Sequence, residues 1–267
     1  MKFGIIGYGN LGKALVRGMV HTGVNQEKIF VNARTEKTRA TAKEEYGKIN
    51  ITDNKEELVR MTDVIVLVVE PKNSADVLND IGKYSIDGKA IISLMAGITR
   101  DEISQMLAKQ GRTARIVRVM PNIAIANANG ILGITYDEAD YDEIQEVVQV
   151  FDRLGYMLKL DETQLDYVTV TAASGLAFAA SLMNAYQEAS NILLCNNLQS
   201  REITLHIFEN VIDMMKSENC SFEDIVKRIT TKGGTTEAGM NSLNQDMIME
   251  TLKKCVQSSY DKVKRIK

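Results

Sequence analysis

The stretch "KFGIIGYGNLG", Lys2 to Gly12, joins a short apolar run to three glycines at G-x-G-x-x-G spacing. A helical pattern follows, from about residue 12 to residue 22. An apolar strand, a glycine turn and a helix in this order are the context in which this spacing binds a dinucleotide. The first glycine makes a tight turn, the second lets the backbone approach the pyrophosphate, and the third permits close packing of helix on strand. We therefore expect phosphates at the start of the helix, where N–H groups favour anions. The predicted contacts are Gly7, Gly9, Asn10, Leu11 and Gly12.

Outward from this stretch, short β-branched runs alternate with helical patterns. Strands are predicted at residues 28–33, 63–69, 89–95, 114–120, 130–135 and 156–160, and helices at 36–46, 74–81, 101–109 and 141–154. Such alternation indicates βαβ units and a mainly parallel sheet. From about Glu162 the strand patterns stop, and helices are predicted at residues 164–196, 200–216, 222–229 and 237–264. The expected fold is α/β: a Rossmann-type, mainly parallel sheet in residues 1–161 followed by an all-α domain in residues 162–267.

The composition of the 267 residues restricts the class of function. A net charge of −3 gives no reason to expect nucleic acid. The cysteines, Cys195, Cys220 and Cys255, form no C-x-x-C pair, so neither a disulfide framework nor a metal site is predicted, and a reducing cytoplasm is the simpler setting. Residues 167–187 carry no charge and are long enough to span a bilayer. Their many small and polar residues give little transfer energy, which favours a buried core helix or a subunit-interface helix and no membrane contact.

The end of the second predicted strand, "VNARTEK", indicates which dinucleotide binds. Enzymes that use NAD usually place Asp or Glu there to hold the ribose 2′-hydroxyl. This chain offers Asn32, Arg34 and Thr35, and its first acid, Glu36, comes later in the predicted helix. An arginine pairs with a 2′-phosphate, and amide and hydroxyl groups donate hydrogen bonds to it. We therefore predict a preference for NADP(H), with NAD(H) left open because a surface arginine at a strand end is the alternative interpretation of Arg34.

An ordered series of motifs along nearly the whole chain resembles one enzyme family. The motifs are "GYGNLGKAL", "NART", "VVEPKN", "SLMAGIT", "RVMPN", "LDYVTVTAASGLAF" and "KGGTT". Together they resemble pyrroline-5-carboxylate reductase, which reduces a cyclic imine acid to proline. The resemblance implies an NADP-dependent oxidoreductase of proline biosynthesis. It also implies that the helical domain is a dimerisation domain, in a homodimer or a ring of dimers.

The resemblance further implies which residues form the site. The loops that match those around the family's nicotinamide and adenosine contain Asn54, Val69, Glu70, Pro71, Ala96 and Gly97. Asn54 is expected just before the third predicted strand. The residues that match the family's substrate pocket are Glu162, Thr231, Gly233, Gly234, Thr235 and Thr236.

The chemistry of the "GGTT" motif can also be argued from the residues themselves. Glycines and threonines at a helix start give exposed N–H groups, hydroxyl donors and a positive dipole end, which suits a carboxylate. The Thr236 hydroxyl can accept a hydrogen bond from an iminium nitrogen or relay its proton, so Thr236 is the predicted catalytic residue. Strong acid–base residues are not required, because the cofactor makes the bond. His21, at a helix end, and His206, expected to be a partly buried polar residue, are therefore not assigned to catalysis.

Several positions depart from the family pattern, and most lie at the expected pocket. They are Glu70, Ile123, Ala124, Ala173, Leu176, Phe178, Thr231 and Lys232. Phe178 lacks the hydroxyl of the usual tyrosine, and Lys232 adds a cation beside the expected anion site. A divergent reductase with the same chemistry is the favoured interpretation. The alternative is an NADP-binding paralogue, non-catalytic or re-specialised, with a regulatory role.

Overall fold

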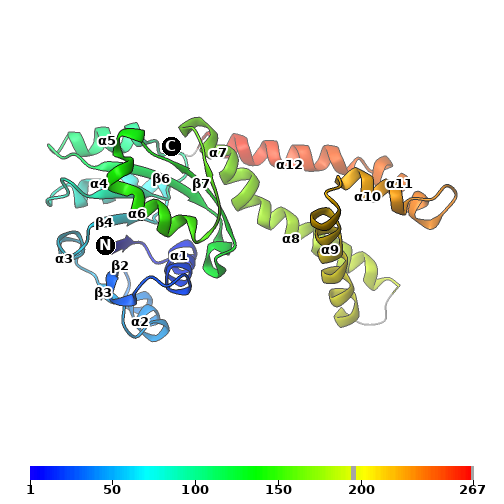
Figure 1. Cartoon of the computed structure of the whole chain (residues 1–267), viewed down its shortest axis with the longest axis horizontal. Coiled ribbons are helices and arrows are strands. Elements are labelled where there is room, and N and C mark those ends of the chain that lie inside the picture. The colour runs from blue at the N-terminus through cyan, green and yellow to red at the C-terminus, as the bar shows by residue number, and fades with distance from the viewer. Residues whose placement is uncertain (194–196, 266–267) are drawn as a thin grey trace. The chain divides into compact units, whose positions relative to one another are not determined.

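The computed structural model describes residues 1–193 and 197–265, so Cys195 lies outside the described residues. The chain divides into two compact units (Figure 1). Unit 1 consists of Met1–Ser174 together with Ser259–Lys267, and unit 2 consists of Gly175–Ser258. The boundary between residues 161 and 162 was predicted from the sequence pattern. It differs in kind from these contact-based units and stays a prediction.

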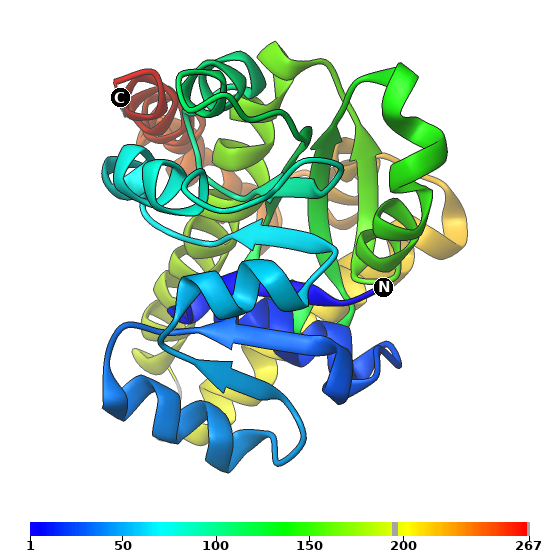
Figure 2. The same cartoon turned by 90° about the vertical axis from the view of Figure 1, so that its left-hand side faces the viewer.

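Unit 1 is built on an eight-stranded sheet with the order β3-β2-β1-β4-β5-β6-β7-β8 (Figure 2). The strands are β1 (Phe3–Ile6), β2 (Ile29–Asn32), β3 (Asn50–Thr52), β4 (Val64–Leu67), β5 (Ala90–Ser93), β6 (Arg115–Pro121), β7 (Gly130–Thr135) and β8 (Gly155–Lys159). Every neighbouring pair is parallel except β6 and β7, which are antiparallel. The carboxyl ends of β1 to β6 therefore lie along one edge of the sheet.

Helices cover both faces of the sheet and produce two separate apolar clusters. The helices are α1 (Asn10–His21), α2 (Glu36–Glu45), α3 (Lys55–Met61), α4 (Ser74–Ile81), α5 (Arg100–Ala108) and α6 (Tyr141–Asp152). One cluster joins Ile5 and Val66 to α1, α2 and α6, and the other joins Ile65 to α3, α4 and α5. Because successive strand residues point to opposite faces, strands covered on both sides are apolar at nearly every position. This explains the uninterrupted apolar runs in the sequence.

The sequence prediction missed one strand and one helix of unit 1. β3 is only three residues long, and α3 has seven residues with a short apolar face. Asn54 precedes the third predicted strand, which is β4, as expected, and it also follows the missed strand β3, at the N-cap of α3. Its Oδ1 atom accepts hydrogen bonds from the backbone N–H groups of Glu56 and Glu57 at 2.9 and 3.2 Å.

From Glu162 onward the described chain is helical, as predicted. Its elements are α7 (Leu165–Val168), a π-helical segment (Thr169–Ser174), α8 (Gly175–Asn191), α9 (Asn197–Glu218), α10 (Phe222–Ile229), α11 (Thr235–Gln245) and α12 (Ile248–Val263). The prediction of one helix over residues 237–264 is wrong. The chain turns at Met247, whose φ of 52° lies in the left-handed region, and α12 starts one residue later.

One helical run among the described residues, Glu162–Asn191, is long and apolar enough to cross a bilayer by length and composition alone. The alternative of a core helix is wrong for α8, because none of its residues is buried within the chain. α8 packs against α9 inside unit 2 (Figure 1) and leaves apolar side chains such as Leu182 and Tyr186 exposed.

Candidate functional site

The loops predicted to bind the cofactor follow neighbouring parallel strands. The fingerprint residues Gly7 to Gly12 follow β1, Thr35 follows β2, Asn54 follows β3, residues 69–71 follow β4, and residues 96–97 follow β5. Because these strands are parallel, all five loops lie at the same edge of the sheet. Ligands of open α/β sheets bind outside the carboxyl ends of the strands, so this edge is the candidate cofactor site.

The three fingerprint glycines differ in what surrounds them. Gly7 has a φ of 108°, and a Cβ atom there would lie 2.1 Å from the carbonyl oxygen of Val68. A Cβ atom on Gly12 would lie 2.3 Å from the carbonyl oxygen of Gly7. A Cβ atom on Gly9, the N-cap of α1, would meet nothing within 4 Å. Gly7 and Gly12 therefore allow the tight turn and the close packing of α1. The open space at Gly9 leaves room for a pyrophosphate to approach the backbone.

The predicted cofactor-binding residues at the end of β2 differ in exposure and in their hydrogen-bond partners. Asn32 is buried, and its Nδ2 atom donates to the carbonyl oxygen of Thr52 in β3 at 3.2 Å. Thr35 caps α2, since its Oγ1 atom accepts a hydrogen bond from the N–H of Thr38. Arg34 is exposed between them. The Asn32 side chain therefore bonds within the sheet, whereas the Arg34 side chain is exposed at the end of β2.

The loop after β4 carries Glu70 where the family pattern has lysine. Its carboxylate pairs with the ammonium group of Lys72 at 2.6 Å, and both side chains are exposed. The hydrogen bond from Lys72, the charge of Lys72 and the charge of Arg34 hold the pKa of Glu70 below its ordinary value. Lys72 therefore compensates locally for the reversed charge at position 70.

Glu162 lies at the start of the 3₁₀ turn that leads into α7 and is held by two arginines. Its Oε1 atom accepts from Nη1 of Arg118 at 2.5 Å, and its Oε2 atom accepts from Nε of Arg100 at 2.7 Å. Arg118 comes from β6 and is only 2% exposed. Its Nη2 atom also donates to the carbonyl oxygen of Met95 at 3.4 Å. Glu162 is thus attached to the loop that carries Ala96 and Gly97.

The charge state of Glu162 follows from two opposing effects. Partial burial raises its pKa, whereas the hydrogen bonds from Arg118 and Arg100 and the charge of Arg118 lower it. The net pKa lies below the ordinary value, so Glu162 is a carboxylate at neutral pH. It is a charged structural partner of the two arginines and not a proton donor.

In unit 2, "TKGGTT" forms a turn followed by the first turn of α11. The N–H of Gly234 donates to the carbonyl oxygen of Thr231 at 3.0 Å, and Gly234 is the N-cap of the helix. Thr235 and Thr236 are its first residues, so the helix starts two residues before the predicted start at residue 237. The first N–H groups of a helix have no acceptor within it. Here the preceding residue, Gly233, with a φ of 75°, donates its N–H to the carboxylate of Glu237 at 2.8 Å.

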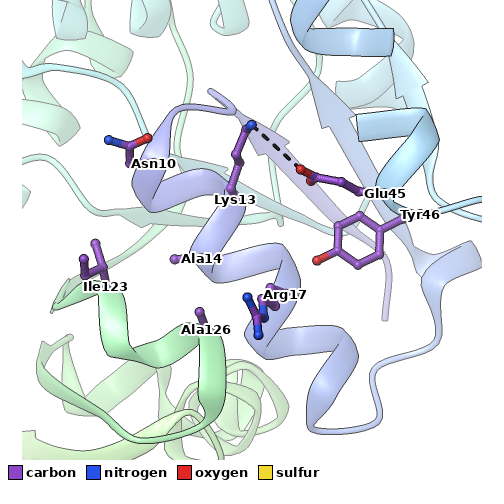
Figure 3. A pocket seen from close by; sticks show the side chains of 8 residues that line it. All are labelled: Asn10, Lys13, Ala14, Arg17, Glu45, Tyr46, Ile123 and Ala126. Carbon is purple, nitrogen blue, oxygen red and sulfur yellow. Dashed lines mark ion pairs between the residues drawn. The ribbon is translucent and has the colours of Figure 1, made fainter. Parts of the chain in front are cut away.

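A hollow of about 660 Å³ lies beside α1, between the end of α2 and the turn that carries Ile123 and Ala126 (Figure 3). Of the predicted site residues only Asn10 is among its lining residues, which also include Lys13, Arg17, Glu45, Tyr46 and Ile123. Lys13 points toward Glu45 at 3.9 Å. Its walls include Asn10 of the fingerprint and Glu45, whose carboxylate accepts a hydrogen bond from the Tyr8 hydroxyl of the fingerprint at 3.0 Å.

The two histidines lie away from these loops in the chain. His21 is the last residue of α1, as expected. The expectation that His206 is partly buried is wrong: its side chain is 70% exposed, with Nδ1 3.3 Å from Glu209. Among the described residues no group of three or more His, Cys, Asp or Glu side chains is arranged to hold a metal ion.

Comparison with known proteins gives matches along nearly the whole chain. Residues 2–97 match the family described as "NADP oxidoreductase coenzyme F420-dependent", and residues 162–266 match "Pyrroline-5-carboxylate reductase dimerisation". The chain is 27% identical over 268 residues to pyrroline-5-carboxylate reductase 2 of Bacillus subtilis, covering 100% of this chain and 95% of that protein. It is also 27% identical to pyrroline-5-carboxylate reductase of Aquifex aeolicus, covering 97% of that protein. The chain belongs to the pyrroline-5-carboxylate reductase family.

A solved structure supports the fold. The NADP-bound pyrroline carboxylate reductase of Plasmodium falciparum superimposes with a TM-score of 0.89 at 24% identity, covering 100% of this chain and 98% of that one. The predicted fold class is therefore confirmed, with an NADP-binding Rossmann-type domain followed by the helical domain of this family.

Sequence reasoning missed three residues that act on the candidate site. Arg118 and Arg100 hold Glu162, and Glu237 occupies the N–H of Gly233. Arg118 left a signal, because a charged residue interrupts the apolar run "RIVRVM" of a strand that is covered on both faces. A glutamate at the third position of a helix is likewise typical of a side chain that reaches back to the preceding backbone.

Proposed function

We propose that this protein catalyses the NADPH-dependent reduction of a cyclic imine acid, with L-1-pyrroline-5-carboxylate as substrate and L-proline as product. The observation that carries the proposal is the "GGTT" helix start of α11, found in a chain that matches pyrroline-5-carboxylate reductases from end to end. The open space at Gly9 and the exposed Arg34 support NADP(H) as the cofactor.

The proposed substrate site uses backbone more than charged side chains. The N–H of Thr235, the N–H of Gly233 once Glu237 releases it, and the dipole of α11 bind the carboxylate of the substrate. Thr231 completes the turn that presents them, since its carbonyl oxygen accepts the N–H of Gly234. Glu162 acts at the site by fixing the loop that follows β5, through Arg100 and Arg118.

Bound NADPH supplies the hydride that adds to the imine carbon. The chain orients the imine and stabilises its protonated form, in which the nitrogen carries the hydrogen that remains in the product amine. The Thr236 hydroxyl accepts a hydrogen bond from this N–H, so Thr236 is the proposed catalytic residue. The pairs Val69 with Pro71 and Ala96 with Gly97 border the nicotinamide in the proposal.

Assembly follows from the exposed apolar side chains of unit 2. Leu182, Tyr186, Ile203 and Ile207 are between 36% and 42% exposed on α8 and α9. Exposed patches of this kind mark protein interfaces. We therefore propose a homodimer formed through the helical unit, which the match to the dimerisation family supports, with a ring of dimers as a further assembly, in the cytoplasm.

The experiment is an assay of purified protein for NADPH oxidation upon addition of pyrroline-5-carboxylate, with NADH in parallel. The expected result is turnover that falls at least about tenfold in Thr236→Ala and is largely restored in Thr236→Ser. Thr251→Ala removes a threonine of α12 whose hydroxyl donates to the carbonyl oxygen of Met247, four residues earlier in the chain, and it serves as the matched control. Cofactor binding without turnover on any cyclic imine would overturn the proposal and favour the regulatory paralogue.

A further inference from the structure

The side chain of Arg39 connects two loops of the cofactor edge. Arg39 lies in the second turn of α2, and its guanidinium reaches back to the end of β2. There Nη1 donates to two consecutive carbonyl oxygens, that of Ala33 at 3.0 Å and that of Arg34 at 3.2 Å. One nitrogen therefore fixes the direction of two successive peptide groups in the loop that carries Arg34.

The other terminal nitrogen of Arg39 holds a second loop. Nη2 lies 3.4 Å from the carboxylate of Asp53, which sits between β3 and the α3 N-cap residue Asn54. The Arg39 side chain is 25% exposed and the Asp53 side chain 70% exposed. The planar fork of an arginine can hold several acceptors in one geometry, which the single ammonium group of a lysine cannot do.

Arg34 itself has a different environment. Its side chain is exposed, and the structure records no hydrogen bond or ion pair of its guanidinium with any described residue. Its charge acts on Glu70 in the loop after β4, and Arg39 holds its backbone through the Arg34 carbonyl group. A recognition residue binds well only when its support is rigid.

We propose that Arg39 is a positioning residue for NADP(H): its fork fixes the β2–α2 loop against Asp53, so that Arg34 is presented to the 2′-phosphate of the cofactor. The inference rests on the proposed binding of NADP(H) at this edge. It assigns to Arg39 a selectivity role that acts through Arg34 and involves no contact of its own with the cofactor.

The test measures dissociation constants of NADPH and NADH by fluorescence titration of the full chain without imine substrate. The variants are Arg39→Lys, Arg34→Ala and the double variant, with Arg60→Lys as the control at an exposed arginine of α3. Melting temperatures are measured alongside. Arg39→Lys is expected to raise the dissociation constant of NADPH about fivefold to tenfold and that of NADH less than about twofold.

The double variant separates positioning from direct contact. Because Arg39 acts through Arg34, the double variant should bind NADPH no more weakly than Arg34→Ala alone. A further loss equal to that of Arg39→Lys would show that Arg39 binds the cofactor itself and would overturn the inference. The inference would also be overturned if Arg39→Lys left the ratio of the NADPH and NADH dissociation constants unchanged, or if the wild type showed no preference for NADPH. Tight NADPH binding without imine turnover would contradict the proposed reductase and leave the Arg39 result standing.

Discussion

The backbone N–H of Gly233 donates a 2.8 Å hydrogen bond to the carboxylate of Glu237, so a carboxylate of the chain already occupies part of the proposed anion site. A substrate carboxylate must share or displace this bond. We predict that Glu237→Gln lowers the KM for pyrroline-5-carboxylate about threefold, with little change in kcat, because a weaker acceptor then competes for the N–H. Steady-state kinetics at saturating NADPH measure it. Glu223→Gln, in the first turn of α10, is the matched control. An unchanged KM in Glu237→Gln would show that the N–H of Gly233 does not bind the substrate.

The fingerprint glycines should respond differently to the same substitution. Gly9→Ala adds a methyl group to open space, so the melting temperature should stay unchanged while the dissociation constant of NADPH rises about tenfold or more. Gly7→Ala and Gly12→Ala press a methyl group against backbone and should cost about 2 kcal/mol or more of folding free energy. Thermal melts and cofactor titrations measure both effects, with Gly47→Ala as the control. Normal NADPH binding by Gly9→Ala would contradict the proposed place of the pyrophosphate.

Arg34 should determine the choice between the two dinucleotides. Removing its guanidinium in Arg34→Ala leaves a 2′-phosphate without a charged partner, while a 2′-hydroxyl loses little. The expected result is a dissociation constant for NADPH raised about tenfold, with that for NADH nearly unchanged. The same titrations on Arg60→Ala provide the control. A parallel loss of both cofactors would instead point to a general effect on the loop.

The pairing of Glu162 with buried Arg118 predicts a pH dependence of stability. The pKa of Glu162 in the folded chain lies below its ordinary value of 4.5, so the stabilisation is fully present above about pH 4.5 and is lost as the pH falls through the folded-state pKa. Glu162→Gln leaves the Arg118 charge unpaired and should cost about 3 kcal/mol at pH 7. The deficit relative to wild type should shrink in urea unfolding at pH 3.

The control for this measurement is Glu138→Gln, which breaks an exposed ion pair with Lys159. Exposed pairs contribute about 0 to 1 kcal/mol, so this variant should behave nearly as wild type at both pH values. A Glu162→Gln deficit that is the same at pH 7 and pH 3 would show that packing, and not charge, makes the contribution.

The parts of the fold that were predictable have strong local signals. The strands covered on both faces are continuous apolar runs, and α4 and α10 have the predicted bounds because their apolar periodicity begins and ends sharply. β3 was missed because three residues give too short an apolar run. α3 did have a local signal, because Asn54 with Glu56 and Glu57 in the following turn is typical of a capped helix start. The turn at Met247 has no glycine or proline to mark it, so the pattern predicted a single helix across it.

The candidate site was predictable only where a motif carries its own chemistry. Gly7 to Gly12 and Gly233 to Thr236 have such motifs. The contacts of Arg39 and Arg118 join residues far apart in the chain, and no spacing rule indicates them. Asn32 has the right chemistry for a ligand, and only the position of β3 shows that its amide donates to the sheet.

Asn122, the last residue of the "RVMPN" motif, is 2% exposed, and its side chain bonds to three backbone groups around the turn. Its Oδ1 atom accepts the N–H groups of Ala124 and Ile131, and its Nδ2 atom donates to the carbonyl oxygen of Ala172 in the π-helical segment. The bond from Ala124 needs a backbone N–H, which a proline at this position would lack. The family pattern has Thr-Pro where this chain has Ile123 and Ala124, so here a hydrogen bond to Asn122 replaces the constraint of the proline ring, and the Ile123 side chain is 59% exposed. Such a turn allows evolution to change the ligand preference of a pocket while the scaffold beneath it is inherited intact.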